Sequence, residues 1–274
     1  MLPEVTTVQP DPGLPPVEYI RIGDGPGRVV ILPGNPGSAR FYLPFMTSLH
    51  ERLGAEVIAL SYPGHEFRQP SSRCLSLDET IQWARGFLQQ CPGPLAVVGH
   101  SIGAHIAMQA LSDRSIPIIA TFPFLQFTGA SRRQRMLHWM VWHLGPVRAV
   151  VAAHRLLVPD TVKRRWGRRD FRHEAALAAA IDVLRDASVK ATLTLARHEF
   201  ADLARPFELP RPFLQVLCAE ADHWFPTAHR RRLQALQDGV QEVPGVQHAF
   251  AVCPHQSEVV ARLVADALTP VFRA

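Results

Sequence analysis

Residues 94–111 read PLAVVGHSIGAHIAMQAL, and this stretch decides the fold. A run of β-forming residues ends at a Gly-X-Ser-X-Gly motif, Gly99 to Gly103, and a strong helix-forming segment follows it directly. The motif alone often occurs by chance, but a preceding strand and a following helix are the context in which a serine sits on a sharp, strained turn. We therefore interpret Ser101 as an exposed nucleophile rather than as a serine that only caps the helix.

The segments on either side alternate between apolar strands and amphipathic helices. The expected strands cover residues 28–33, 56–64, 94–100, 116–124, 212–222 and 237–245. The expected helices cover residues 39–54, 75–91, 101–112 and 257–272. Strands that alternate with helices usually pair in parallel, with helices on both faces of the sheet. The sequence thus predicts an α/β fold with a mostly parallel central sheet flanked by helices.

The first 27 residues depart from this alternation. Residues 1–16 contain five prolines and are expected to form an extended arm that carries no chemistry. A strand at 17–22 precedes the strand at 28–33, and the Gly- and Pro-rich turn between them favours a hairpin-like reversal. The arm has neither the basic start nor the apolar run of a secretory signal, so we expect the protein in the cytoplasm.

Residues 125–209 form a helical, basic block without the short strands seen before and after it. We predict that this block is a helical lid inserted into a core made of residues 17–124 and 210–274. Between Thr128 and Asp170, ten basic side chains accompany only two acidic ones, an excess of +8, whereas the whole chain has a net charge of +5. The basic character belongs to this segment, and no nucleic-acid-binding module accompanies it.

The first helix of the predicted lid is apolar around nearly its whole circumference, with Trp139 and Trp142 among its side chains. Such a helix either packs on the core or meets a lipid surface, and both readings stay open. A break at Gly145-Pro146, followed by Arg148, excludes a membrane span here.

A serine hydroxyl needs a neighbouring base, and the base needs an acid that orients it. In sheets of this type the acid and then the histidine follow the serine along the chain. Asp222 lies in the loop after the strand at 212–222, at the carboxyl edge where sites in open α/β sheets form. Because of this position we predict Asp222 as the orienting acid, with Glu220 as its close rival.

The base is predicted from the same chain order. His248 lies between the last expected strand and the last helix, which is the position that the order requires. The other candidates after the serine strand are His223, His229 and His255. His255 is more typical of a residue beside the start of the last helix. His100 and His105 flank the serine but are interpreted as structural.

The tetrahedral intermediate of acyl transfer needs two backbone N–H donors. Ile102, which follows the nucleophile, is predicted to provide the first. The second is expected from the loop after the strand at 28–33, where Pro36 has no N–H, which leaves Asn35. No cofactor or metal is expected, because the four cysteines are scattered and form no CxxC pair.

Taken together, these motifs predict an α/β-hydrolase fold with an inserted helical lid. Several segments also resemble, in the same order, the motifs of the lipid droplet-associated hydrolases. These segments are LPGNPGSARFYLPF, SYPGHE, VVGHSIGAH, TFPF, ADHWFP and QHAF. The resemblance spans most of the chain from residue 28 to the final helix and places Ser101, Asp222 and His248 on the family's triad. It implies an association with neutral lipids and sterol esters.

The predicted function is hydrolysis of carboxylic esters, of lipids or other hydrophobic compounds, through a Ser-His-Asp triad and an acyl-enzyme. The alternative is a lipid-surface binding protein that keeps the hydrolase scaffold with little or no turnover, since a complete triad does not guarantee a competent pocket. The expected partners are a hydrophobic ester and, through the basic aromatic lid, a lipid or membrane surface. Peripheral association with lipid droplets or membranes would follow from such contact.

Overall fold

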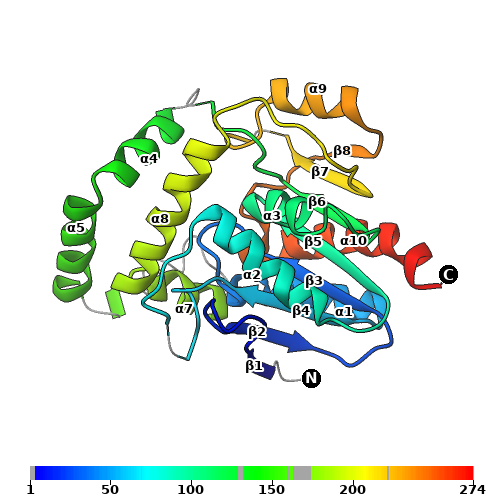
Figure 1. Ribbon diagram of the computed structural model, residues 1–274, viewed down its shortest axis with the longest axis horizontal. Helices are drawn as coiled ribbons and strands as arrows, with labels where there is room; N and C mark the ends of the chain where they lie inside the picture. Colours follow the sequence, from blue (N-terminus) through cyan, green and yellow to red (C-terminus); the bar gives the residue numbers. More distant parts are fainter. Residues whose placement is uncertain are drawn as a thin grey trace.

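A mostly parallel sheet of eight strands forms the centre of the described part of the chain (Figure 1). The strands are β1 (Glu4–Val8), β2 (Val17–Ile22), β3 (Arg28–Leu32), β4 (Glu56–Ser61), β5 (Leu95–His100), β6 (Ile118–Thr121), β7 (Gln215–Ala219) and β8 (Val240–Val243). They lie in the order β1-β2-β4-β3-β5-β6-β7-β8, and all pairs from β4 to β8 are parallel. The computed structural model describes residues 4–68, 70–128, 132–158, 161–162, 174–220 and 222–273.

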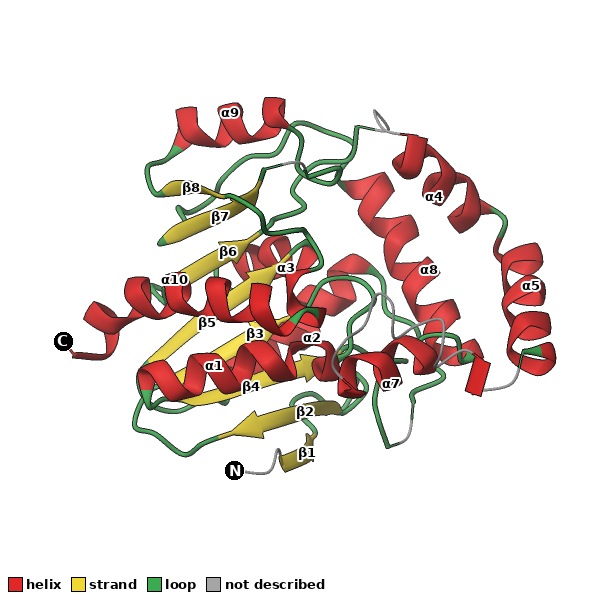
Figure 2. Ribbon diagram, turned by 180° about the vertical axis from the view of Figure 1, so that it is seen from behind, coloured by secondary structure: helices red, strands yellow, loops and turns green. Residues whose placement is uncertain are grey.

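Helices cover both faces of this sheet, as the alternation of elements predicts. The helices are α1 (Leu43–Leu53), α2 (Leu77–Gln89), α3 (Ile102–Ala110), α9 (Thr227–Leu236) and α10 (Pro254–Arg273). Helices α1 and α10 pack together on one face, and α2 and α3 pack together on the other (Figures 1 and 2). Every residue of β4, β5 and β6 is buried, which explains their continuous apolar sequences.

Local sequence signals set the ends of two of these helices. Helix α2 begins with a capping box, in which the Ser76 hydroxyl accepts from the Glu79 N–H and the Glu79 carboxylate accepts from the Ser76 N–H. Helix α1 ends at Gly54, whose φ of 60° lies in the left-handed region that favours glycine. The sequence thus marks where α2 begins and where α1 ends, just before β4.

The prediction of a hairpin between the strands at 17–22 and 28–33 is wrong. Strand β4 lies between β2 and β3, antiparallel to β2 and parallel to β3. The chain does reverse direction, but β2 pairs with a strand that follows it by more than thirty residues. In the N-terminal arm, β1 adds an antiparallel edge strand to β2, and a turn follows it in which the Leu14 N–H donates to Asp11 O.

Between β6 and β7 the described residues form helices and no strand. These helices are α4 (Arg132–Trp142), α5 (Leu144–Leu157), α7 (Glu174–Asp182) and α8 (Asp186–Asp202). Helix α8 packs against α4, α5 and α2 (Figure 2). We call residues 125–209 the helical insertion; its role as a lid stays a prediction. Seven of the basic and acidic residues counted there lie outside the described residues, namely Asp160, Lys163, Arg164, Arg165, Arg168, Arg169 and Asp170.

Candidate active site

Ser101 lies on a sharp turn between β5 and α3. Its φ of 54° and ψ of −122° are rare for a residue with a side chain. A Cβ on Gly99 would lie 2.4 Å from Ala104 Cα, and one on Gly103 would lie 2.1 Å from Leu32 O. Both glycines are therefore needed for the turn to pack. Although Ser101 precedes α3, its side chain makes no capping hydrogen bond, which favours the nucleophile over the cap.

Neighbouring strands hold the backbone of Ser101 in place. Its N–H donates to Thr121 O at 3.1 Å, and its carbonyl accepts from the Phe124 N–H at 3.0 Å. On the other side runs the loop after β3, where a Cβ on Gly34 would lie 3.1 Å from Ser101 Cβ. The predicted nucleophile and the predicted oxyanion loop thus lie side by side.

The predicted acid and base meet at the same edge of the sheet. His248 Nδ1 donates to Asp222 Oδ2 at 2.8 Å, and Asp222 Oδ1 accepts from the Trp224 N–H at 2.8 Å. Burial acts to raise the pKa of the Asp222 carboxyl, but the hydrogen bond and charge of His248 outweigh it and lower the pKa. With Nδ1 donating to a carboxylate, His248 Nε2 is left as a proton acceptor.

The third contact of the triad is not made. Within the described residues, no hydrogen bond joins the Ser101 hydroxyl to the His248 ring. That ring lies instead beside His100, the residue before Ser101, with 5.1 Å between the ring centroids. Catalytic hydrogen bonds are often long or poorly aligned before substrate binds. The structure thus brings Asp222 and His248 together and places His248 next to the serine turn.

The rival residues lie elsewhere. Glu220 is exposed, and so are His223 and His255. His229 is buried in α9, where its ring contacts Phe207 and Phe225. Within the described residues, no hydrogen bond or ring contact joins the side chain of any of these residues to Asp222 or His248.

The loop after β3 carries the second predicted oxyanion donor. Its Gly34 N–H already donates to the Tyr42 hydroxyl at 2.9 Å, and its Pro33 carbonyl accepts from the Tyr62 hydroxyl at 2.7 Å. The backbone N–H of Asn35 and that of Ile102 donate to no other described residue. Neither N–H group is thus engaged by the described residues, which is compatible with the predicted role as oxyanion donors.

A buried hydrogen-bond chain connects this loop to the backbone of His248. Because the Tyr42 hydroxyl accepts from Gly34, its own proton goes to His100 Nδ1, 2.5 Å away. His100 Nε2 then donates to the His248 carbonyl at 2.9 Å. Burial lowers the pKa of His100 to about 3, so the ring is neutral. His100 is structural, as expected, but the sequence did not indicate its partners.

A second polar contact links the same loop to the helical insertion. Asn35 Nδ2 donates to Glu199 Oε1 and to Thr192 O, both on α8 and both at 3.0 Å. Glu199 is buried, and burial raises its pKa to about 8, an effect that the Asn35 hydrogen bond only partly offsets. Glu199 stands within an ordinary helical pattern, and nothing in the sequence marks it.

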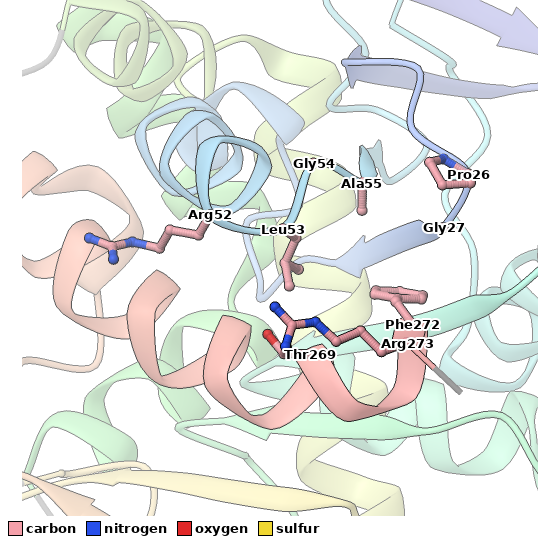
Figure 3. Close-up of a pocket in the computed structure, with 9 residues that line it drawn as sticks. All are labelled: Pro26, Gly27, Arg52, Leu53, Gly54, Ala55, Thr269, Phe272 and Arg273. Atoms are coloured by element: carbon pink, nitrogen blue, oxygen red, sulfur yellow. The ribbon is translucent and has the colours of Figure 1, made fainter.

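A hollow of about 140 Å³ lies at the other end of the sheet (Figure 3). Gly27 and Ala55, which line it, precede β3 and β4, and Thr269 and Phe272 come from the end of α10. Because sites in this kind of sheet form at the carboxyl ends of strands, this hollow is not part of the candidate active site.

None of the helices in the described part of the chain has the length and hydropathy that a membrane crossing requires. Within the same residues, no three His, Cys, Asp or Glu side chains are grouped so that they could hold a metal ion. All four cysteines are free.

Solved structures of the same fold include enzymes with several activities. A haloalkane dehalogenase, DatA from Agrobacterium tumefaciens C58, is 17% identical, with a TM-score of 0.75 over 98% of this chain and 97% of the dehalogenase. The epoxide hydrolase CorEH is 14% identical, with a TM-score of 0.70 over 98% of this chain and 100% of its own. The esterase EaEST from Exiguobacterium antarcticum is 15% identical, with a TM-score of 0.63 over 96% of this chain and 98% of the esterase.

Similarity to these structures confirms the α/β-hydrolase fold. Among curated proteins, no sequence is similar enough to count as a relative. A family model described as "Lipid-droplet associated hydrolase" matches residues 26–251, which is most of the chain. The protein is a hydrolase built on an α/β-hydrolase scaffold. The chain belongs to the lipid-droplet associated hydrolase family, the family that its motifs resemble.

Proposed function

We propose that this hydrolase cleaves carboxylic esters of hydrophobic compounds through Ser101, His248 and Asp222. The observation that carries the proposal is the 2.8 Å hydrogen bond from His248 Nδ1 to Asp222 Oδ2, beside the strained turn of Ser101. This bond orients the imidazole and leaves Nε2 free to take a proton.

The proposed reaction begins when Ser101 Oγ attacks the ester carbonyl carbon and His248 Nε2 accepts the hydroxyl proton. The carbonyl oxygen becomes an oxyanion, which accepts hydrogen bonds from the backbone N–H groups of Asn35 and Ile102. Collapse of the intermediate breaks the bond to the alcohol, which leaves with the proton from His248. Water then attacks the acyl-enzyme by the same route, and the carboxylic acid is released.

Aromatic side chains near His248 support a hydrophobic substrate. The rings of Phe122 and Trp224 each lie 6.4 Å from the His248 ring. Phe124 packs edge-on against Trp224 at 5.5 Å. Trp224 is the partly exposed member of this group, and an apolar ring beside the base favours an acyl or alcohol group that gains free energy by leaving water.

A fluorophosphonate probe tests the nucleophile, because it reacts only with an activated serine. We expect the wild-type protein to be labelled and the Ser101→Ala protein to be unlabelled. A panel of aryl esters graded by acyl length then measures kcat and KM, and we expect turnover that depends on Ser101. Full turnover by Ser101→Ala would sink the proposal.

We also propose that α4 contacts a lipid surface. This contact belongs to the alternative function, lipid-surface binding, and the exposed side chains of α4 support it. Met136, Trp139 and Trp142 on α4 are 56%, 55% and 51% exposed. Their spacing of three residues places them on one side of the helix. Large apolar side chains exposed together are typical of an interaction surface. We call these three residues the α4 face.

Vesicle flotation with and without anionic lipid tests this contact. We expect the wild-type protein to float with vesicles and a triple serine variant of the α4 face to stay in the soluble fraction. A protein that floats but is not labelled by the fluorophosphonate would favour the lipid-binding function without turnover. No flotation with either vesicle would remove the lipid proposal and leave the esterase proposal intact.

A further inference from the structure

Glu199 is a buried carboxyl group that the proposed reaction does not use. It lies on α8 with 5% of its surface exposed. Burial raises its pKa to about 8, so the group is mainly protonated at neutral pH. A protonated carboxyl still offers an acceptor oxygen, and Glu199 Oε1 accepts from Asn35 Nδ2 at 3.0 Å.

The side-chain amide of Asn35 is bound entirely by α8. Nδ2 donates both to Glu199 Oε1 and to Thr192 O, which lie two turns apart on the same helix. No other described residue hydrogen-bonds to this amide, and its Oδ1 is buried without a partner there. The orientation of Asn35 therefore depends on α8.

The residues that precede Asn35 in the loop are bound by the core. Pro33 O accepts from Tyr62, and the Gly34 N–H donates to Tyr42, both of which belong to the core around the sheet. These contacts fix the chain up to Asn35, and just after it Gly37 O accepts from the Tyr62 N–H at 2.8 Å. Beyond them, the two bonds to α8 are the hydrogen bonds that hold the side chain of the predicted oxyanion donor.

We propose that Glu199 is a positioning residue for the oxyanion loop: by binding the side chain of Asn35, it fixes the direction of the Asn35 backbone N–H. This inference rests on the proposed function, because it gives a helix of the insertion a role in stabilising the oxyanion. Glu199 acts on the ester only through Asn35 in this proposal, and within the described residues no hydrogen bond joins it to Ser101.

Packing of α8 does not explain a carboxyl group at this position. Ser188 Oγ donates to Gly64 O at 2.6 Å, and apolar side chains such as Val189 and Leu193 join the core. A buried carboxyl costs free energy of desolvation that a leucine would not. A group retained at such a cost, beside a predicted donor, suggests a role in the reaction.

Two substitutions of Glu199 separate positioning from packing. Glu199→Gln keeps an acceptor oxygen for Asn35, whereas Glu199→Leu keeps the volume and removes the acceptor. With a short-chain aryl ester we expect kcat to fall roughly tenfold or more in Glu199→Leu, with little change in KM, because the loss of a whole oxyanion donor costs about 10²–10³-fold. Glu199→Gln should stay within about threefold of the wild type, since its amide oxygen still accepts.

Ser188→Ala is the matched control, because it removes another buried bond between α8 and the core. We expect it to lower the unfolding temperature while leaving kcat unchanged. A loss of kcat in Ser188→Ala equal to that in Glu199→Leu would mean that loosening α8 alone explains the effect, and the inference would be overturned.

A double-mutant cycle with Asn35→Ala gives the sharpest test, because alanine keeps the backbone N–H and removes the amide. If Glu199 acts through Asn35, the double variant should be no slower than Asn35→Ala alone. If the double variant instead loses kcat by the product of the two single losses, the inference is contradicted. A Glu199→Leu protein with wild-type kcat would contradict it as well. In both cases a wild type labelled at Ser101 would leave the proposed function standing, whereas an unlabelled, inactive wild type would overturn the function itself.

Discussion

At the scale of single residues, the hydroxyl of Tyr42 joins two parts of the site. It accepts from the Gly34 N–H and donates to His100 Nδ1, so that His100 can donate to the His248 carbonyl. Tyr42→Phe leaves two buried groups without partners, and we expect unfolding to become easier by about 1–3 kcal/mol. We also expect a lower kcat, because the loop and His248 lose their connection. Urea unfolding and ester kinetics measure both effects.

Tyr19→Phe is the control for this change. Tyr19 packs edge-on against Phe87, and its hydroxyl bonds to none of the described residues. This variant should match the wild type in stability and kcat. Equal losses in both variants would contradict the role assigned to Tyr42.

The carboxylate of Asp222 is expected to act by orienting His248. Asp222→Asn keeps the shape of the side chain but removes the charge that holds the proton on Nδ1. We expect kcat to fall on the order of 10³–10⁴-fold, with KM little changed. Glu220→Gln tests the rival acid, and it should behave as the wild type because Glu220 is exposed. A large loss of kcat in Glu220→Gln together with wild-type kcat in Asp222→Asn would make Glu220 the orienting acid instead.

Chain order makes Ser101, Asp222 and His248 predictable from the sequence. Ser101 and Asp222 follow strands with apolar runs that are easy to recognise, and His248 follows the short last strand β8. Parallel strands bring their carboxyl ends to one edge. Tyr42 and Glu199 have no such signal. Their partners lie 58 and 164 residues away in the chain, and one sequence carries no record of which distant side chains meet.

At the scale of elements, the contact between α3 and β3 depends on Gly103. A Cβ there would lie 2.1 Å from Leu32 O and 2.6 Å from Pro33 O, so Gly103→Ala must push the helix away from the strand. We expect a loss of about 3 kcal/mol in the free energy of unfolding. Ester turnover should also fall, because Pro33 begins the oxyanion loop. Denaturant unfolding and ester assays measure the two losses.

Gly145→Ala provides the comparison on α5. Nothing lies within 4 Å of a Cβ at that position, and alanine favours a helix over glycine by up to about 1 kcal/mol. We therefore expect unchanged activity and equal or greater stability. A Gly103→Ala protein as stable as Gly145→Ala would contradict the close packing of α3 on β3.

Most elements could be predicted because their periodicity and end signals are local. Helix α2 begins at a capping box, and α1 ends at Gly54 with positive φ, so both ends are visible in the sequence. The pairing of β2 could not be predicted in this way. A glycine-rich turn favours a hairpin, but the buried surface of β4 fits between the two strands, and burial of a central strand outweighs the preference of a turn.

At the scale of the whole molecule, buried histidines make stability depend on pH. Burial lowers the pKa of His65 and His105 to about 4 and that of His100 to about 3. Below the unfolded pKa of about 6.5, the unfolded chain takes up protons that the folded protein refuses. The free energy of unfolding contributed by these groups is thus complete above that pH and is lost as the pH falls toward 4.

His65→Gln should reduce this dependence. Between pH 7 and pH 5, we expect the variant to lose roughly 2 kcal/mol less unfolding free energy than the wild type, because it lacks one titrating group. Urea unfolding at both pH values provides the measurement. His255→Gln, at an exposed histidine in α10, should show the full loss. Identical pH dependence in all three proteins would argue against a neutral, buried His65.

The long connection between β6 and β7 has a consequence for protein synthesis. Strand β7 pairs with β6 across the whole insertion, and Asp222 follows β7 whereas His248 follows β8. Chains fold from the amino end as they leave the ribosome, and distant pairings form late. A half-made copy thus holds Ser101 without the base proposed for it, and the proposed reaction becomes possible only after residue 248 has been added.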